Sequence, residues 1–316
     1  MGWFSRKTNQ TSLLAISLKT DGLRCAVTRL QADTLPRIEF LTFYPKGDKT
    51  WNFLLERLAK EVDAKQFKCS LLLSLNEYQL FALDAMNVPP EEIKSAVRWR
   101  LKDMLDYHTD DATIDVFDIP GDTHNNGRNA SLIAVVARNQ LIAERQNLFK
   151  QTRLNLQVID IADMAQRNLS CLLAPEGRGL AMLSFDENGG LLTLTFNNEL
   201  YLSRRLDINL SALQVDDEQA RFNVFERISL ELQRSLDHFE RQHNYITTAK
   251  LVLAPMGEIG AVLQTYLASN MYMPIELMDL SKMLDVAHIP ELKEAQQQHL
   301  FYQIIGASLR KEEVAL

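Results

Sequence analysis

The sequence is poor in glycine. Its 316 residues include 12 glycines, whereas a usual share of about 7% would give roughly 22. Glycine lets a backbone come close to phosphate oxygens, because it adopts turn conformations with positive φ at little cost. The shortage therefore weighs against a kinase or an ATPase. The glycine-rich motifs GxGxxG and GxxxxGK[ST] and the nucleophile motif GxSxG are also missing.

Cysteine and grouped metal ligands are scarce as well. Cys25, Cys69 and Cys171 lie far apart without a CxxC pair, which is typical of buried, reduced thiols in a reducing compartment. His238 and His243 lie five residues apart on a predicted helix and so face different sides of it. We expect no metal site.

The chain has neither an excess of basic residues nor a long apolar run. Its 34 Lys and Arg residues against 41 Asp and Glu residues give a net charge of −7, which argues against a nucleic-acid binder. No apolar run reaches about 18 residues, and the N-terminus lacks the apolar region of a signal peptide. We therefore expect a cytoplasmic protein.

The first residues combine aromatic and basic side chains. Trp3 and Phe4 are followed by Arg6 and Lys7, a mixture that can rest at a membrane interface with its cations toward anionic lipid. Such a short segment is also typical of a solvated terminus. Trp3 and Phe4 are therefore candidate contacts for a peripheral association with the membrane.

One order of predicted elements occurs twice in the chain: three strands, a helix and a further strand. The first set comprises strands at 13–18, 23–30 and 38–43, a helix at 51–63 and a strand at 69–75. The second comprises strands at 180–185, 191–196 and 199–206, a long helix carrying residues 222–239 and a strand at 250–254. A helix at 258–268, a strand at 274–278 and a helix at 298–310 follow it.

This duplication predicts an α/β protein of two lobes. The break Pro175–Gly179 is the predicted boundary, with lobe I at 1–175 and lobe II at 176–316. A duplicated unit of this order is typical of the actin, sugar kinase and Hsp70 superfamily, an actin-like (ribonuclease H-like) fold whose lobes face each other across a cleft. We interpret residues 87–157 as an α/β subdomain inserted into lobe I, with a helix that starts at Pro89-Pro90-Glu91-Glu92.

Several short stretches of the chain together resemble one known family. They are Arg98-Trp99 after the proline-rich helix start, Ala137-Arg138, Val158-Ile159-Asp160, Leu202-Ser203-Arg204 and the C-terminal stretch Ile305–Arg310. Over essentially its whole length the chain resembles the PilM family of type IV pilus assembly proteins, most closely its mannose-sensitive haemagglutinin (MSHA) branch.

The resemblance implies an actin-like fold with an inserted subdomain and a cytoplasmic protein beneath the inner-membrane platform of the pilus machine. It implies binding of the cytoplasmic tail of a PilN-like bitopic membrane protein, together with contacts to other platform proteins. We expect an extended peptide to enter a groove beside the inserted subdomain. Arg98 and Trp99 are candidate partner contacts, although a buried packing role is the preferred interpretation of Trp99.

Many members of the family bind ATP, and their first hairpin carries an Asp-x-Gly-[Ser/Thr] turn. The acid organises Mg²⁺ and water, while the glycine and the hydroxyl group surround phosphate oxygens. The matching positions here are Ser17, Lys19 and Thr20, so the acid is missing and a side chain stands in place of the glycine.

The two other nucleotide elements depart from the pattern as well. The second hairpin has Ser184 for the acid and Asp186 for the glycine. A Gly-Gly pair against which adenosine lies is replaced by Pro255-Met256. We therefore expect no bound cofactor and no catalytic residue, because phosphoryl transfer depends on positioning and charge stabilisation.

The leading hypothesis is a non-enzymatic scaffold, a pseudo-ATPase that docks a membrane-protein tail. The alternative is an actin-like ATPase that binds ATP and Mg²⁺, with Lys19 as a phosphate contact and Asp186 as a shifted acid. A sugar kinase of the same superfamily fits least, because it also needs a catalytic base and an intact phosphate hairpin.

Overall fold

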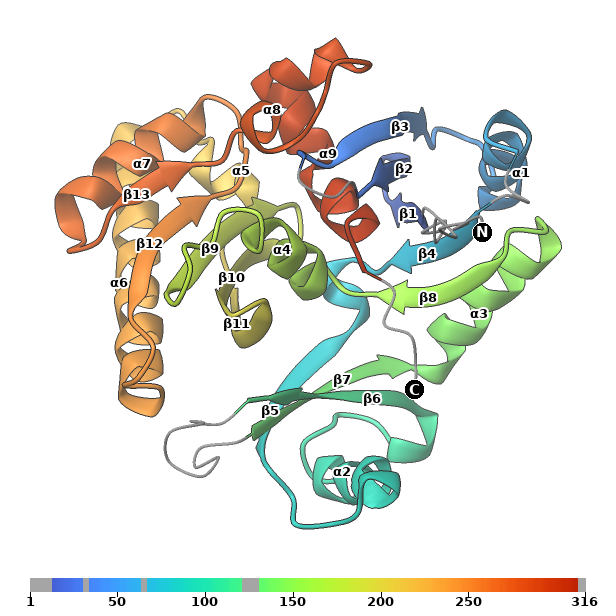
Figure 1. Ribbon diagram of the computed structural model, residues 1–316, viewed down its shortest axis with the longest axis horizontal. Coiled ribbons are helices and arrows are strands. Elements are labelled where there is room, and N and C mark those ends of the chain that lie inside the picture. Colours follow the sequence, from blue (N-terminus) through green and yellow to red (C-terminus); the bar gives the residue numbers. More distant parts are fainter. Residues whose placement is uncertain (1–12, 31–33, 64–66, 121–130, 312–316) are drawn as a thin grey trace, which may run out of the picture.

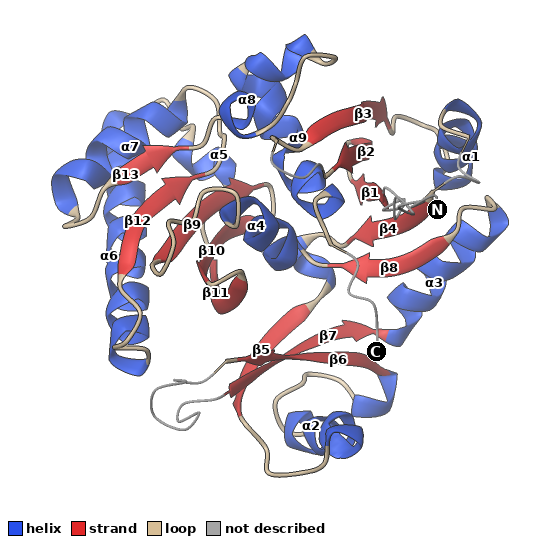
Figure 2. Ribbon diagram, in the orientation of Figure 1, coloured by secondary structure: helices blue, strands red, loops and turns tan. Residues whose placement is uncertain are grey.

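The computed structural model describes residues 13–30, 34–63, 67–120 and 131–311. The proposed membrane contacts Trp3 and Phe4 lie outside these ranges. Figures 1 and 2 show two lobes side by side and a smaller sheet with one helix beneath them. Within the described ranges, none of the helices has the length and hydrophobicity needed to span a bilayer.

Lobe I contains a five-stranded sheet in the order β3-β2-β1-β4-β8. Its strands are β1 (Leu13–Lys19), β2 (Gly22–Arg29), β3 (Arg37–Pro45), β4 (Lys68–Leu72) and β8 (Leu156–Asp160). The first three are antiparallel neighbours, and β4 and β8 run parallel to β1. Along β1, Leu14 and Ile16 face helices α1 (Trp51–Glu61) and α3 (Asn139–Gln151), whereas Ala15 faces the centre of the molecule. Both faces of the sheet are therefore buried.

Lobe II repeats the arrangement with the order β11-β10-β9-β12-β13. Its strands are β9 (Gly179–Asp186), β10 (Gly189–Phe196), β11 (Glu199–Leu206), β12 (Thr248–Leu253) and β13 (Ile275–Leu277). Two helices, α6 (Glu218–Gln242) and α7 (Ile259–Asn270), cover its outer face. The predicted duplication is confirmed. The short helices α5 (Leu210–Leu213) and α8 (Leu280–Met283) complete the lobe.

Two helices lie between the sheets, α4 (Ala162–Ser170) and α9 (Ala295–Ser308). They cross so closely that a Cβ on Gly306 would lie 2.3 Å from the carbonyl oxygen of Ala165. Asn168 also donates a hydrogen bond from Nδ2 to the carbonyl oxygen of Gly306, at 2.9 Å. The sequence analysis did not predict α4. Its buried positions include polar side chains such as Gln166, so it has no simple apolar stripe.

The inserted subdomain is an antiparallel sheet in the order β5-β7-β6 packed against helix α2 (Ile93–Leu101). It spans residues 79–138 and not the expected 87–157, because β5 precedes that range and α3 and β8 pack in lobe I. Its strands are β5 (Gln79–Asp84), β6 (Ala112–Ile119) and β7 (Ser131–Arg138). Strands β5 and β6 were not predicted from the sequence, because both are only partly buried and lack a continuous apolar run. Val97 and Leu101 of α2 bury themselves against this sheet, as their spacing predicts.

Candidate functional site

Two equivalent hairpins, one from each lobe, meet in the cleft. Lys19 is the last residue of β1 and pairs with Gly22 across the first hairpin. Asp186 is the last residue of β9 and pairs with Gly189 across the second. The two side chains therefore occupy the same position in the two halves of the duplicated fold, the position where the resemblance implies a glycine in a phosphate-binding turn.

Lys19 and Asp186 form an ion pair that bridges the lobes. The Nζ of Lys19 lies 3.0 Å from Oδ2 of Asp186, and these side chains are 12% and 5% exposed. Glu187 lies 3.7 Å from the same ammonium group, and Oδ1 of Asp186 accepts a hydrogen bond from the backbone N–H of Asn188 at 2.8 Å. Both side chains are thus engaged with protein groups, and the sequence analysis did not foresee that they pair with each other.

The space left in the cleft is small. A cavity of about 50 Å³ is lined by Ser17, Lys19, Arg24, Asp186 and residues of α9 such as Tyr302. Sites that hold drug-sized ligands usually enclose about 300–1,000 Å³, so this space suits one or two water molecules.

Ser17 and Ser184, at the positions where the resemblance implies acids, are both buried. Ser184 is 1% exposed and donates a hydrogen bond from Oγ to Oε1 of Gln166 at 2.7 Å. Gln166 donates in turn to the carbonyl oxygen of Met182, at 2.7 Å. Ser17 is 3% exposed and lines the cavity, whereas Thr20 is exposed at the tip of its turn. Ser184 therefore helps to fix α4 against the sheet of lobe II.

The Pro255-Met256 pair is also occupied by contacts within the protein. The ring N–H at Nδ1 of His299 donates to the carbonyl oxygen of Pro255 at 2.7 Å. Burial lowers the pKa of His299, and this hydrogen bond offsets only part of the effect. Met256 is 3% exposed and packs into the core of lobe II. Gly257, with φ near +70°, begins the turn into α7.

Arg24, the other cation of the cavity wall, is held by its own hairpin. Its two terminal nitrogens contact the two carboxylate oxygens of Asp21 at 2.8 and 2.5 Å, and its guanidinium lies over the ring of Phe43. Burial raises the pKa of Asp21, but hydrogen bonding and the charge of Arg24 outweigh it, so that pKa is lowered. The Tyr302 hydroxyl is buried and has no hydrogen-bond partner among the described residues.

Arg98 and Trp99 have different surroundings. Arg98 donates to the backbone carbonyl oxygens of Thr109 and Ala112, which fixes the loop after α2. Trp99 is 81% exposed, so the prediction that it is buried is wrong. The apolar face of α2 is filled by Val97 and Leu101, and Trp99 projects from another side of the helix.

A groove lies beside the inserted subdomain at the open edge of the lobe I sheet. Strand β8 is the last strand of that sheet, and no described strand pairs with its outer edge. The groove has a volume of about 300 Å³, with buried Phe149 of α3 as one wall and residues 154–159 as the other. α2 packs beneath the smaller sheet (Figure 1), so Trp99 does not line this groove.

A buried polar cluster that was not predicted from the sequence joins Tyr78, which directly precedes β5, to α4 and lobe II. Asp163 of α4 is fully buried and accepts hydrogen bonds from the hydroxyls of Tyr78, at 2.5 Å, and Ser203. The guanidinium of Arg205 lies 4.6 Å from the centre of the Tyr78 ring. These residues come from distant segments, and no local spacing in the sequence indicates that they meet.

Other site chemistry is sparse in the part of the chain that the structure describes. No group of three or more His, Cys, Asp or Glu side chains there could hold a metal ion. The three cysteines are free thiols; Cys25 and Cys69 are buried and Cys171 is half-buried. Burial raises the pKa of all three thiols.

Comparison with solved structures supports the fold. The chain is similar to a chain of a PilM–PilN type IV pilus biogenesis complex, with 14% identity and a TM-score of 0.68, covering 95% of this chain and 98% of that one. It is also similar to a Bacteroides thetaiotaomicron protein with an actin-like ATPase fold and unknown function, with 9% identity, a TM-score of 0.50 and coverage of 92% and 99%. No protein-family model and no curated protein matches the sequence. The chain therefore has the actin-like fold that its duplicated pattern predicts.

Proposed function

We propose that this chain is a non-enzymatic adaptor of a type IV pilus assembly platform, a PilM-like protein of the MSHA type related to MshI. In this role it binds the cytoplasmic tail of a PilN-like inner-membrane protein, which holds it at the cytoplasmic face of the membrane beside other platform proteins. The fold shared with a chain of the PilM–PilN complex supports this proposal, as does the resemblance of the quoted sequence stretches.

The observation that carries the non-enzymatic part is the ion pair between Lys19 and Asp186. Its two members stand where a working member of the superfamily has glycines around the phosphates, and they lie 3.0 Å apart. The carboxylate that could replace the missing acids is thereby neutralised by a lysine, and the cavity beside it has a volume of about 50 Å³. Phosphoryl transfer needs a positioned Mg²⁺ and a charge-stabilising site, so we assign no nucleotide chemistry to the cleft.

We place the tail in the groove between α3 and β8. An open strand edge offers unpaired backbone N–H and C=O groups, and an extended peptide can add to it as a further strand. Half-buried Val158, which lines the groove, supplies an apolar side-chain contact. Exposed Trp99 does not line this groove, and we assign it to a different platform protein, because exposed tryptophan is a frequent interface anchor.

The test is capture of a synthetic PilN-like tail by the purified chain, with and without Mg-ATP. Equal capture in both conditions supports the adaptor, whereas capture that requires the nucleotide refutes it and favours the ATPase. Val158→Asp places a charge in the groove and should abolish capture. The matched variant Val262→Asp changes a similar side chain on lobe II and should leave capture unchanged. Circular dichroism of both variants confirms that they fold.

A further inference from the structure

Lobe II carries a second groove, on the side of the molecule away from lobe I. It has a volume of about 580 Å³ and lies between α6 and α7. Its floor is aromatic: the rings of Phe222 and Tyr266 meet edge to face with centroids 5.5 Å apart, and Phe225 lies at the same distance from Tyr266. Phe222 is 49% exposed and Val262 is 47% exposed. Partly exposed aromatic and aliphatic side chains around one concave surface are typical of a binding groove.

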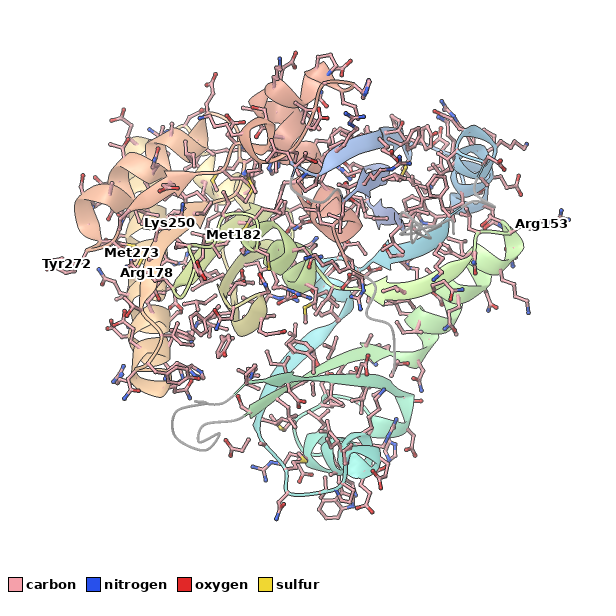
Figure 3. The ribbon with its side chains drawn as sticks, viewed as in Figure 1. Arg153, Arg178, Met182, Lys250, Tyr272 and Met273 are labelled. Atoms are coloured by element: carbon pink, nitrogen blue, oxygen red, sulfur yellow. The ribbon has the colours of Figure 1, made fainter. Side chains whose placement is uncertain are left out.

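The lobe around this groove leaves further apolar side chains in solvent. Tyr272, in the turn after α7, is fully exposed, and Figure 3 shows it projecting from the edge of lobe II. Leu230 of α6 is 44% exposed and Leu277 of β13 is 40% exposed. Lobe II therefore exposes apolar side chains outside the groove as well.

The charges beside the groove are mainly acidic. Glu218 lines it, and Glu226 and Glu258 are exposed on or beside the same two helices. Among the described residues, none of these three carboxylates has a hydrogen bond or an ion pair. Burial, and then the charge of Glu226, raise the pKa of the Tyr266 hydroxyl. The one cation of the lining, Arg221, donates to the backbone carbonyl oxygen of Val215 at 3.2 Å.

This chemistry selects an occupant with aromatic side chains and nearby positive charge. The chain contains such a segment outside the described residues, at 1–12. Trp3 and Phe4 could fill the aromatic floor, while Arg6 and Lys7 could face the carboxylates, and the segment has no acidic residue. Pairing of opposite charges at the rim of an interface fixes register and partner choice.

The position of β1 argues for a segment from another molecule. Residues 1–12 lead into β1 of lobe I, whereas α6 and α7 lie on the far side of lobe II (Figure 1). Twelve residues reach at most about 40 Å when fully extended, and a domain of this length has a radius of gyration of about 20 Å. A segment from the same molecule would need nearly all of that length to go around both lobes.

We propose that the groove between α6 and α7 binds residues 1–12 of a second copy of this chain. Because the segment and the groove are different surfaces, the contact is heterologous, and each copy can bind one neighbour and be bound by another. The contact produces rings or open chains of subunits rather than closed dimers. This proposal does not depend on the binding of a PilN-like tail.

The first experiment uses a fluorescently labelled peptide of residues 1–12 as the probe. The receptor is the full chain with Trp3→Ser and Phe4→Ser, which removes the competing segment. We expect saturable binding by fluorescence anisotropy, weakened at least about tenfold by Phe222→Ser or by Val262→Asp. Phe53→Ser, which removes an aromatic side chain that is 53% exposed on lobe I, is the matched control and should leave binding unchanged. Absence of binding, or equal binding to all variants, overturns the proposal.

The second experiment measures the mass of the full chain by sedimentation velocity over a range of concentrations. The mass should rise with concentration for the unmodified chain, but not for Trp3→Ser/Phe4→Ser or Val262→Asp, while Val158→Asp still associates. If the peptide binds but the full chain stays monomeric, the groove binds residues 1–12 of the same molecule, and the proposed contact between copies is overturned. The unmodified chain could instead bind phosphatidylglycerol vesicles without self-association, and Trp3→Ser/Phe4→Ser could abolish that binding. This result would assign residues 1–12 to the membrane and would also overturn the proposed contact between copies.

Discussion

Replacing Lys19 with methionine tests whether the ion pair across the cleft holds the lobes together. At 3.0 Å and an effective dielectric constant of about 20, the gross attraction is about 5–6 kcal/mol. Desolvation of two nearly buried charges offsets much of this. Lys19→Met leaves the carboxylate of Asp186 buried with only the Asn188 N–H as a partner, so we expect a loss of about 3 kcal/mol in the free energy of unfolding.

The reciprocal change, Asp186→Asn, should lower the free energy of unfolding less than Lys19→Met does. Asp186→Asn keeps an oxygen that accepts from Asn188, and Lys19 retains Glu187 at 3.7 Å, so we expect a loss of about 1–2 kcal/mol. The double variant leaves no unpaired charge. It should therefore be more stable than the sum of the two single changes predicts, by about 2 kcal/mol.

Urea unfolding at pH 7, followed by circular dichroism, measures this coupling energy. The matched control is the pair of Lys250 and Glu276, which are 2.7 Å apart within lobe II and are 20% and 52% exposed; Figure 3 labels Lys250. Because Glu276 is largely in solvent, Lys250→Met and Glu276→Gln should show a coupling of less than about 1 kcal/mol. A coupling between Lys19 and Asp186 no larger than that of the control would refute the reasoning.

Three further changes probe other parts of the molecule. Gly306→Ala places a Cβ 2.3 Å from the carbonyl oxygen of Ala165. It should therefore lower the free energy of unfolding, measured by urea titration, by about 2–3 kcal/mol. An unchanged free energy of unfolding would mean that α4 and α9 are not in close contact. Trp99→Ala removes a side chain that is 81% exposed, so the melting temperature of this variant should match that of the unmodified chain, and tail capture should persist. A decrease of more than about 1 kcal/mol in the free energy of unfolding would show that Trp99 is packed. Burial lowers the pKa of His299 from 6.5, so the contribution of the neutral imidazole to stability is complete above pH 6.5 and is lost as the pH falls toward the folded-state pKa. The free energy of unfolding should therefore decrease less between pH 7.5 and pH 5.5 in His299→Gln than in the unmodified chain. An equal decrease in the two proteins would contradict a buried neutral imidazole.

Strands and helices with strong periodicity could be predicted from the sequence. The three-strand order of each lobe and the long helix α6 follow from runs of apolar residues and from turn residues such as Asn197-Asn198, which adopt positive φ. Helix α4 could not be predicted in this way. It packs between the two sheets and hydrogen-bonds the lobe II sheet through buried Gln166 and helix α9 through buried Asn168, so polar residues occupy positions where a surface helix would have an apolar stripe.

The candidate site could be predicted only in part. Alignment with the expected hairpin motif locates Lys19 and Asp186, because each stands at a fixed place in a hairpin. Their contact depends on how the lobes close over α4 and α9, which no spacing within either hairpin indicates. The exposure of Trp99 was predicted wrongly for a similar reason, since helical periodicity gives the apolar face of α2 but not which neighbours cover its other sides.

The central claim is that the cleft is present while its nucleotide chemistry is absent. Isothermal titration of the unmodified chain with Mg-ATP tests it most directly, with an actin-like protein that retains both Asp-x-Gly hairpins as the positive control. We predict no saturable heat of binding for this chain under conditions in which the control saturates. Saturable, Mg²⁺-dependent binding that Asp186→Asn abolishes would contradict the account.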